Sequence, residues 1–246
     1  MIYLRSILFH GVWMVWSALM VVAIPVDALF RRGDDGRFVR AASRVWSRGT
    51  MLLLAGICGL RYRVEGREHL PDRPVILACK HQSAFETFVM NIVVPDICIV
   101  YKRELDAIPL FGWFLRKSRM ISVFRGGGAK ALRGMLERAN EEAAKGRNLL
   151  IFPEGTRVAV GDRGTAHAGL IALVRNLKLP VVPVTLNSGV YWPRKSWLCH
   201  PGEITIRFLP AIHEVEKFGR GEMEALVETI SAESDRLCGL EPSGDA

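Results

Sequence analysis

The stretch that decides the fold is VILACKHQSAFETFVMNIVV, residues 75–94, in which a short buried strand leads into a helix. Residues 75–79 form an apolar run of strand length, and residues 84–94 carry apolar side chains at helical spacing. Further predicted strands lie within residues 97–101, 120–124, 148–152, 177–186 and 203–209, and further helices cover 129–145 and 222–237. Strands alternating with amphipathic helices predict an α/β fold, a mixed central sheet with helices on both faces. Polar groups at the strand ends are then the candidates for chemistry.

The composition separates an apolar beginning from a more ordinary remainder. The chain has 246 residues, 50% of them hydrophobic, and its mean hydropathy of +0.18 is high for a water-soluble protein. The apolar excess is concentrated in the first sixty residues. We therefore expect a membrane-embedded helical segment over residues 1–60, one catalytic domain over 61–240 and a frayed tail over 241–246.

The charge favours an anionic partner. A net charge of +8 and a pI near 9.5 suit phospholipid headgroups, a phosphorylated substrate or nucleic acid. The sequence has no interleaved aromatic and basic recognition motif, and its arginines cluster beside apolar segments, so we expect no nucleic-acid partner.

The N-terminal segment permits three interpretations. Residues 7–30 are almost wholly apolar and long enough to span a bilayer, whereas the second apolar run, residues 50–60, is too short. The linker between them carries arginines 31, 32, 37, 40, 44 and 48, with tryptophans nearby, which suits the headgroup level. The alternatives are a spanning anchor, a hairpin of two helices embedded in one leaflet, and a cleaved signal peptide, which lacks a clean cleavage site. We favour the membrane hairpin, because the arginine-rich linker can stay at one interface.

Cysteine and histidine spacing argues against metal sites and disulfides. The five cysteines are scattered, without a CxxC pair, and the six histidines form no HExxH pattern. We predict no metal and a catalytic domain on the cytoplasmic, reducing face of the membrane.

The segment KHQSAFE, residues 80–86, places a histidine directly after a predicted strand. His81 can act as a general base, and the carboxylate of Glu86 can bind its other ring nitrogen and fix the tautomer. The proton would come from a hydroxyl of the substrate. The alternative is structural, because Ser83 and Glu86 also match a capping box.

Two further segments carry groups suited to a phosphate. In FPEGTR, residues 152–157, Pro153 and Gly155 predict a tight turn that exposes the Glu154 carboxylate and lets Arg157 reach a phosphate. Lys102 follows one predicted strand, and Arg125 follows another, before a glycine-rich helix start that suits anions. The alternatives are a simple turn and a solvated basic face.

With these motifs in this order, followed by VVPVTLNSG at residues 181–189, the chain resembles the glycerophospholipid acyltransferase family, in particular its 1-acylglycerol-3-phosphate (lysophosphatidic acid) acyltransferases. The family's first motif, a histidine and an aspartate separated by four residues, maps to His81 and Glu86, with glutamate in place of aspartate. Its second motif maps to Lys102, Pro109, Gly112 and Arg125, with Ser118 where a glycine is usual. The third matches FPEGTR without departure, and the fourth falls on residues 182–184.

The resemblance implies a function and a set of site residues. The activity is transfer of a fatty acyl group from acyl-CoA or acyl carrier protein to the sn-2 hydroxyl of lysophosphatidic acid, giving phosphatidic acid in phospholipid biosynthesis, without a cofactor. His81 and Glu86 are then catalytic. The residues implied to bind the lysophospholipid acceptor are Lys102, Arg125, Glu154, Gly155, Thr156 and Arg157. Rival functions are acylation of another lysolipid, such as a lyso-aminolipid, and non-catalytic lipid binding at a membrane.

Overall fold

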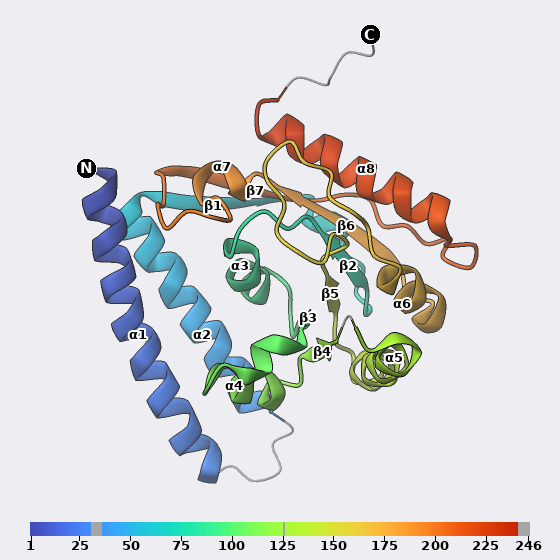
Figure 1. Ribbon diagram of the computed structural model, residues 1–246, viewed down its shortest axis with the longest axis horizontal. Coiled ribbons are helices and arrows are strands. Elements are labelled where there is room, and N and C mark those ends of the chain that lie inside the picture. The colour runs from blue at the N-terminus through green and yellow to red at the C-terminus, as the bar shows by residue number, and fades with distance from the viewer. Residues whose placement is uncertain (31–35, 125, 241–246) are drawn as a thin grey trace.

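A computed structural model of the protein describes residues 1–30, 36–124 and 126–240 (Figure 1). Within them, seven strands form one sheet in the order β1-β7-β6-β2-β5-β3-β4. The strands are β1 (Leu60–Glu65), β2 (Ile76–Cys79), β3 (Cys98–Lys102), β4 (Ile121–Val123), β5 (Leu149–Ile151), β6 (Val181–Leu186) and β7 (Gly202–Phe208). Strands β6, β2, β5, β3 and β4 run parallel, whereas β7 is antiparallel to β6 and parallel to β1. The prediction of a mixed sheet is confirmed.

Helices cover both faces of the sheet (Figure 1). They are α1 (Ile2–Phe30), α2 (Arg37–Leu53), α3 (Phe85–Val93), α4 (Phe111–Lys117), α5 (Gly128–Ala144), α6 (Gly169–Leu177), α7 (Ser188–Tyr191) and α8 (Arg220–Leu237). Strand β2 shows how the two faces are filled, because Leu77 and Cys79 join the core beneath α3, whereas Ile76 and Ala78 join the core beneath α5, α6 and α8. A strand buried on both faces reads as a continuous apolar run, which is why the sequence reveals it.

The predicted elements agree with the structure in the centre of the fold and fail at its margins. The strand and helix of the deciding stretch appear as β2 and α3, within one residue of the predicted bounds. Strand β1 was not predicted, because its sequence LRYRVE interleaves charged residues with apolar ones, as suits the edge of a sheet. Helices α4 and α6 were also missed, and both are short.

The N-terminal helices form a hairpin whose second arm differs from the predicted one. The apolar run at residues 50–60 was expected to supply that arm. Instead α2 begins at Arg37 and ends at Leu53, followed by one π-helical turn, Leu54–Cys58, and then β1. The arginine-rich stretch is helical from residue 37 because one face of α2 packs on α3, where the Asn91 amide donates to the hydroxyls of Ser43 (2.7 Å) and Ser47 (3.2 Å).

Hydrogen bonds from tryptophan side chains join the two N-terminal helices. The indole N–H of Trp13 donates to Thr50 Oγ1, that of Trp16 to the carbonyl of Trp46, and that of Trp46 to Ser17 Oγ, each at 3.1 Å. In the part of the chain that the structure describes, one helical stretch, Ile2–Val21, is long and apolar enough to cross a membrane by length and composition. The tail at residues 241–246 lies outside the described residues.

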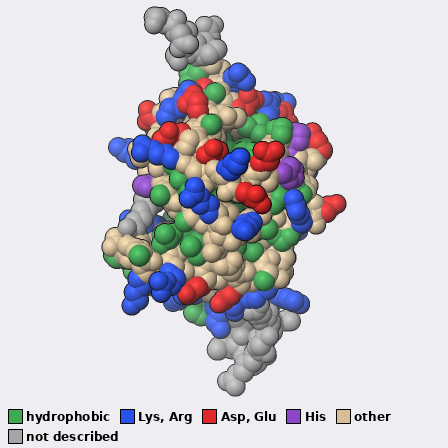
Figure 2. All heavy atoms as spheres, turned by 90° about the vertical axis from the view of Figure 1, so that its right-hand side faces the viewer, with side chains coloured by type: hydrophobic (Ala, Val, Ile, Leu, Met, Phe, Trp, Pro, Cys, Tyr) green, Lys and Arg blue, Asp and Glu red, His purple; other side chains and the backbone are tan. Residues whose placement is uncertain are grey.

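Acidic and basic side chains are interspersed on the face formed by α5, α6 and α8 (Figure 2). The positive net charge is therefore not concentrated on that face.

Candidate active site

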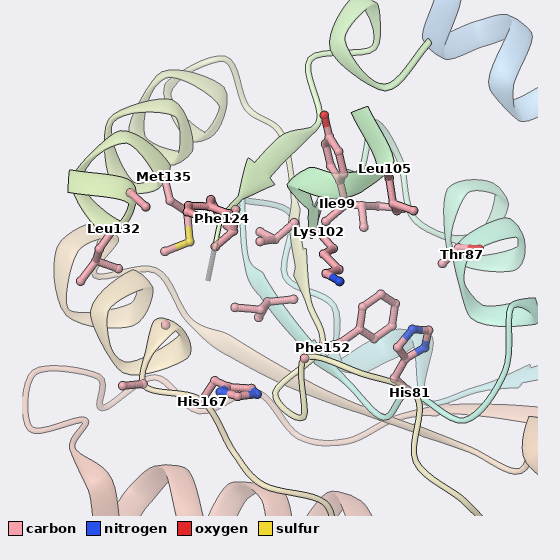
Figure 3. A pocket seen from close by; sticks show the side chains of 18 of the residues that line it. His81, Thr87, Ile99, Lys102, Leu105, Phe124, Leu132, Met135, Phe152 and His167 are labelled. Atoms are coloured by element: carbon pink, nitrogen blue, oxygen red, sulfur yellow. The ribbon is translucent and has the colours of Figure 1, made fainter. Parts of the chain in front are cut away.

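Four neighbouring parallel strands deliver the candidate residues to one edge of the sheet. β2, β5, β3 and β4 lie side by side in this order. His81 follows the end of β2, the FPEGTR turn follows β5, Lys102 is the last residue of β3, and Phe124 follows β4. A cavity of about 510 Å³ opens there, and its lining includes His81, Lys102 and Gly155 (Figure 3). Parallel strands present their carboxyl ends at one edge, so residues distant in sequence meet without any unusual geometry.

His81 lies between a carboxylate and an aromatic ring. Its Nδ1 is 3.6 Å from Glu86 Oε2, and its ring stacks on that of Phe152, with centroids 3.9 Å apart and planes 18° apart. The Nδ1 atom is buried and has no hydrogen-bond partner among the described residues. With Nδ1 on the carboxylate side, Nε2 is the nitrogen available to a substrate. The separation of 3.6 Å exceeds a normal hydrogen bond, and catalytic contacts often shorten only when substrate binds.

The Glu86 carboxylate is fully buried and also holds the backbone before α3. Its oxygens accept the backbone N–H groups of Ser83 (3.0 and 3.1 Å) and Gln82 (3.1 Å) and the hydroxyl of Ser188. The Ser83 hydroxyl in turn accepts the N–H of Phe85 at 3.2 Å. The helix itself has Ala84 as its N-cap, without a side-chain capping bond. One side chain, Glu86, therefore holds the turn before α3 and also faces His81. Ser188, from the NSG segment after β6, was not singled out in the sequence.

The FPEGTR turn differs from the prediction at Glu154. Gly155 adopts a left-handed conformation, φ 62°, and its N–H donates to the carbonyl of Phe152 at 2.9 Å, as the Pro-Glu-Gly sequence suggests. The Glu154 side chain, however, is 2% exposed, so the expectation of an exposed carboxylate was wrong. Its partner is the buried ammonium of Lys80, 3.3 Å from Oε1. Burial raises the pKa of the Glu154 carboxyl, and the Lys80 ammonium opposes that rise.

The predicted phosphate ligands are not all gathered in the cavity. The Lys102 ammonium points into it (Figure 3) and lies 3.3 Å from Glu104 Oε1. Thr156 and Arg157 are exposed and do not belong to the lining. Arg125 lies outside the described residues. Ser118, which replaces the family's usual glycine, is fully buried, and its hydroxyl has no hydrogen-bond partner among the described residues.

The remaining walls of the cavity are mainly apolar. They come from β3, β4, β5 and α5, and include Ile99, Val123, Leu132, Met135 and Ile151. A wall of this kind suits a hydrocarbon chain. His167, in the segment before α6, lines the wall opposite His81 (Figure 3) and was missed in the sequence, where it stands apart from the recognised motifs. Over residues 1–30, 36–124 and 126–240, no group of three His, Cys, Asp or Glu side chains could hold a metal ion.

A histidine backed by a carboxylate and facing an apolar cavity with one ammonium, all at the strand ends of an α/β sheet, defines an acyl-transferring class of enzyme. Comparison with known proteins agrees. A family model described as Acyltransferase matches residues 61–187, and the chain belongs to this acyltransferase family.

Named relatives extend this result. A 1-acyl-sn-glycerol-3-phosphate acyltransferase of Pseudomonas aeruginosa is 35% identical over 85% of this chain and 81% of its own length. The alpha form of Mus musculus is 25% identical over 93% and 78%. Among solved structures, the 1-acyl-sn-glycerophosphate (LPA) acyltransferase of Thermotoga maritima superposes with a TM-score of 0.76, covering 99% of this chain and all of that one. At 20% identity, that likeness shows the fold.

Proposed function

We propose that the protein transfers a fatty acyl group from an acyl thioester, carried by coenzyme A or acyl carrier protein, to the free sn-2 hydroxyl of lysophosphatidic acid. The product is phosphatidic acid, an intermediate of phospholipid biosynthesis. The names of the relatives from Pseudomonas aeruginosa and Mus musculus support this acceptor.

The observation that carries the proposal is the convergence of His81, Lys102 and the FPEGTR turn around one largely apolar cavity. A lysophospholipid has a hydroxyl that must lose a proton, a phosphate that needs a cation and a hydrocarbon chain that needs an apolar surface. The cavity offers a group suited to each of them.

The reaction requires one proton to move twice. His81 takes the proton from the acceptor hydroxyl as its oxygen attacks the thioester carbonyl, and Glu86 stabilises the imidazolium that forms. The tetrahedral oxyanion needs hydrogen-bond donors, for which backbone N–H groups are suitable. Collapse breaks the carbon–sulfur bond, and the departing thiolate takes the proton from His81, so no acyl-enzyme is required.

Acceptor binding is assigned to the second and third motifs. We propose that Lys102 binds the phosphate from inside the cavity, with Arg125 and Arg157 as further ligands, because guanidinium groups suit bidentate phosphate contacts. Glu154, Gly155 and Thr156 belong to the same turn. The burial of Glu154 favours an indirect contribution from that side chain.

We further propose that α1 attaches the protein to a membrane with the catalytic domain on the cytoplasmic face. One apolar helix, Ile2–Val21, and five cysteine thiols without a disulfide among the described residues support this placement. Labelling of cysteines introduced on either side of α1, in intact and permeabilised cells, tests the orientation. Labelling of the catalytic domain from outside intact cells would overturn it.

The test of the function is acylation of lysophosphatidic acid by purified protein, with acyl-CoA and acyl carrier protein donors in parallel. Because general-base catalysis is typically worth about 10² to 10⁴ in rate, His81→Ala should lose turnover by that factor and still bind lysolipid. His200→Ala is the matched control, since His200 is exposed and outside the cavity lining.

Three outcomes would change the conclusion. Wild-type turnover by His81→Ala would show that the mechanism is wrong. Preferential acylation of another lysolipid in competition would keep the chemistry and replace the acceptor, and thioester release with none of the lysolipids would favour a lipid-binding protein instead.

A further inference from the structure

A buried ammonium lies directly behind the candidate active site, and the proposed reaction does not use it. Lys80 stands between strand β2 and His81 and is 1% exposed. Its Nζ lies 2.9 Å from the carbonyl oxygen of Asp162, 2.9 Å from Ser231 Oγ on α8 and 3.3 Å from Glu154 Oε1. One charge therefore connects the end of β2 to the FPEGTR turn, to the loop that follows the turn and to the last helix. Burying a lysine is costly unless it is paired, so this arrangement needs a physical reason.

The charge partner, Glu154, depends on Lys80. Its Oε2 is buried with no hydrogen-bond partner among the described residues. A Cβ built at Gly164, φ 70°, would lie only 3.0 Å from Glu154 Cγ, so the loop backbone closes over the carboxylate and excludes water from that side. Among the described residues, Lys80 is therefore the one ammonium in contact with this carboxylate.

His81 lies close to two carboxylates. Glu86 Oε2 is 3.6 Å from His81 Nδ1. The turn that carries Glu154 packs against His81 on both sides of the glutamate, because the Phe152 ring stacks on the imidazole and the N–H of Val158 donates to the His81 carbonyl at 2.8 Å. The imidazole also opposes the rise in the pKa of Glu154 that burial causes. The other ionisable side chains lining the cavity, among the described residues, are Tyr101, Lys102 and His167. An uncompensated carboxylate beside any histidine favours the imidazolium form, and an imidazolium cannot accept the acceptor's proton.

We propose that Lys80 is a positioning residue of the acyltransferase site, whose buried ammonium serves as counter-ion to Glu154 and so leaves His81 free to act as a base oriented by Glu86 alone. The inference depends on the proposed role of His81 as general base.

The experiment is the pH dependence of kcat/KM for lysophosphatidic acid in a set of charge variants of the full chain. Lys80→Met removes the charge at similar volume. It should move the acid limb of the pH profile, the fall in kcat/KM at low pH, to higher pH by about one unit, because a nearby uncompensated negative charge favours the protonated form of a base. The double variant Lys80→Met/Glu154→Gln removes both charges. It should restore the limb to the wild-type position and be more active at pH 7 than Lys80→Met.

A lysine that only filled space would behave differently. In that case the second substitution would add to the damage, and the acid limb of Lys80→Met would stay at the wild-type pH. Either result would overturn the inference. Lys80→Arg, which keeps the charge, should keep the wild-type limb even if kcat falls.

Glu154→Gln alone provides a test that does not need Lys80→Met to fold. It leaves the Lys80 ammonium unpaired near His81, so the acid limb should move to lower pH, opposite in direction to Lys80→Met. An unmoved limb would contradict the inference. Failure of the proposed function is distinguishable, because the wild-type protein would then not acylate lysophosphatidic acid at any pH, and failure of the proposed base would show as wild-type activity in His81→Ala.

Discussion

At the residue scale, the Glu86 carboxylate serves two purposes that a single substitution can separate. It accepts hydrogen bonds from three donors, the backbone N–H groups of Gln82 and Ser83 and the hydroxyl of Ser188, and its Oε2 lies 3.6 Å from His81 Nδ1. The first set fixes the start of α3, and the second orients the base. Both sets of contacts need a buried carboxylate at this place. Glutamate supplies it here in place of the family's aspartate, and the backbone before α3 fits its longer side chain.

Glu86→Gln should lower kcat by about 10² or more, because the amide keeps one acceptor oxygen but removes the charge that stabilises the imidazolium. The change is measured as kcat for lysophosphatidic acid acylation, with Glu137→Gln, an exposed glutamate on α5, as the control. Full activity in Glu86→Gln would leave Glu86 with its role in the turn before α3 alone.

Arg157→Ala should raise the KM for lysophosphatidic acid roughly tenfold or more, since a hydrogen bond to a charged group is worth about 1.5–3 kcal/mol. The kcat should change much less, because the guanidinium does not touch the reacting hydroxyl. Arg194→Ala, another exposed arginine, provides the control. An unchanged KM would contradict the phosphate role of Arg157.

The sequence identified the residues that follow predicted strands and failed where a contact comes from elsewhere in the chain. His81 and Lys102 could be predicted because a polar residue after a buried strand must lie at the sheet edge. The burial of Glu154 could not, because its partner Lys80 follows a different strand, β2, and the closing loop belongs to a third segment. The position of His167 depends on the packing of the segment before α6, which no motif specifies.

At the scale of elements, α1 presents two different faces. Phe9 is buried, and Trp13 and Trp16 hold α2, whereas large apolar side chains are exposed on the opposite face. The exposed residues are Tyr3, Leu4, Ile7, Leu8, Val12, Met14, Val15 and Leu19. At 100° per residue they occupy a single stripe, as expected of a helix that meets lipid on one side and protein on the other.

The double variant Leu8→Gln/Val15→Gln should release protein from membranes in alkaline carbonate, because each buried apolar side chain contributes about 1.5–3 kcal/mol. Leu240→Gln, an exposed leucine just after α8, is the control. Since the two substituted side chains are exposed, the thermal unfolding temperature should not fall. Unchanged membrane retention would show that this face is not in contact with lipid.

The second helix shows why the N-terminal elements were harder to predict than the sheet. Residues 37–48 have the composition of an interfacial linker, and their helix is stabilised by Ser43 and Ser47 meeting Asn91 of α3. Such contacts between segments outweigh local composition, whereas the strands of the sheet are specified by their own apolar runs.

At the scale of the whole molecule, a series of ion pairs stabilises the amino ends of the central strands, opposite the active site. Arg147 is 1% exposed. Its Nη1 donates a hydrogen bond to Glu142 Oε2 at 2.5 Å, and its Nη2 donates to the carbonyl of Ile97 at 2.9 Å. Asp96 extends the series to Arg40 on α2, 2.7 Å away. The ends of α5, β3 and β5 are thereby joined to the N-terminal helices, while the carboxyl edge remains open for substrate.

Glu142→Gln should lower the free energy of unfolding by about 3 kcal/mol, because it removes the nearer of the two carboxylates, Glu142 and Asp96, that pair with the buried Arg147 guanidinium. Glu141→Gln, at an exposed neighbour on the same helix, should change it by less than about 0.5 kcal/mol. Thermal and denaturant unfolding in detergent measure both. Equal effects of the two substitutions would show that the buried pair does not stabilise the fold.

The same pair predicts a pH dependence of stability. Burial raises the pKa of Glu142, but the hydrogen bonds from Arg147, Lys145 and Arg119 outweigh it, so the net pKa lies below 4.5. A carboxyl with a lowered folded-state pKa stabilises fully above its unfolded value and loses that stabilisation as the pH falls through the folded value. Below pH 4.5, the free energy of unfolding should therefore fall less steeply with decreasing pH in Glu142→Gln than in the wild type.

The contact between α1 and the catalytic body has a consequence for the order of events during synthesis. The N–H of Cys199 donates to Ser6 Oγ at 3.0 Å across 193 residues of sequence. Strand β1 pairs with β7, so it cannot join the sheet until β7 has been synthesised. At about 5–20 residues per second, the ribosome delivers the docking partner of Ser6 roughly 10–40 seconds after the helix itself. During that interval the protein partner of α1 is α2, and the exposed apolar face of α1 is available to a lipid surface before the catalytic domain is complete.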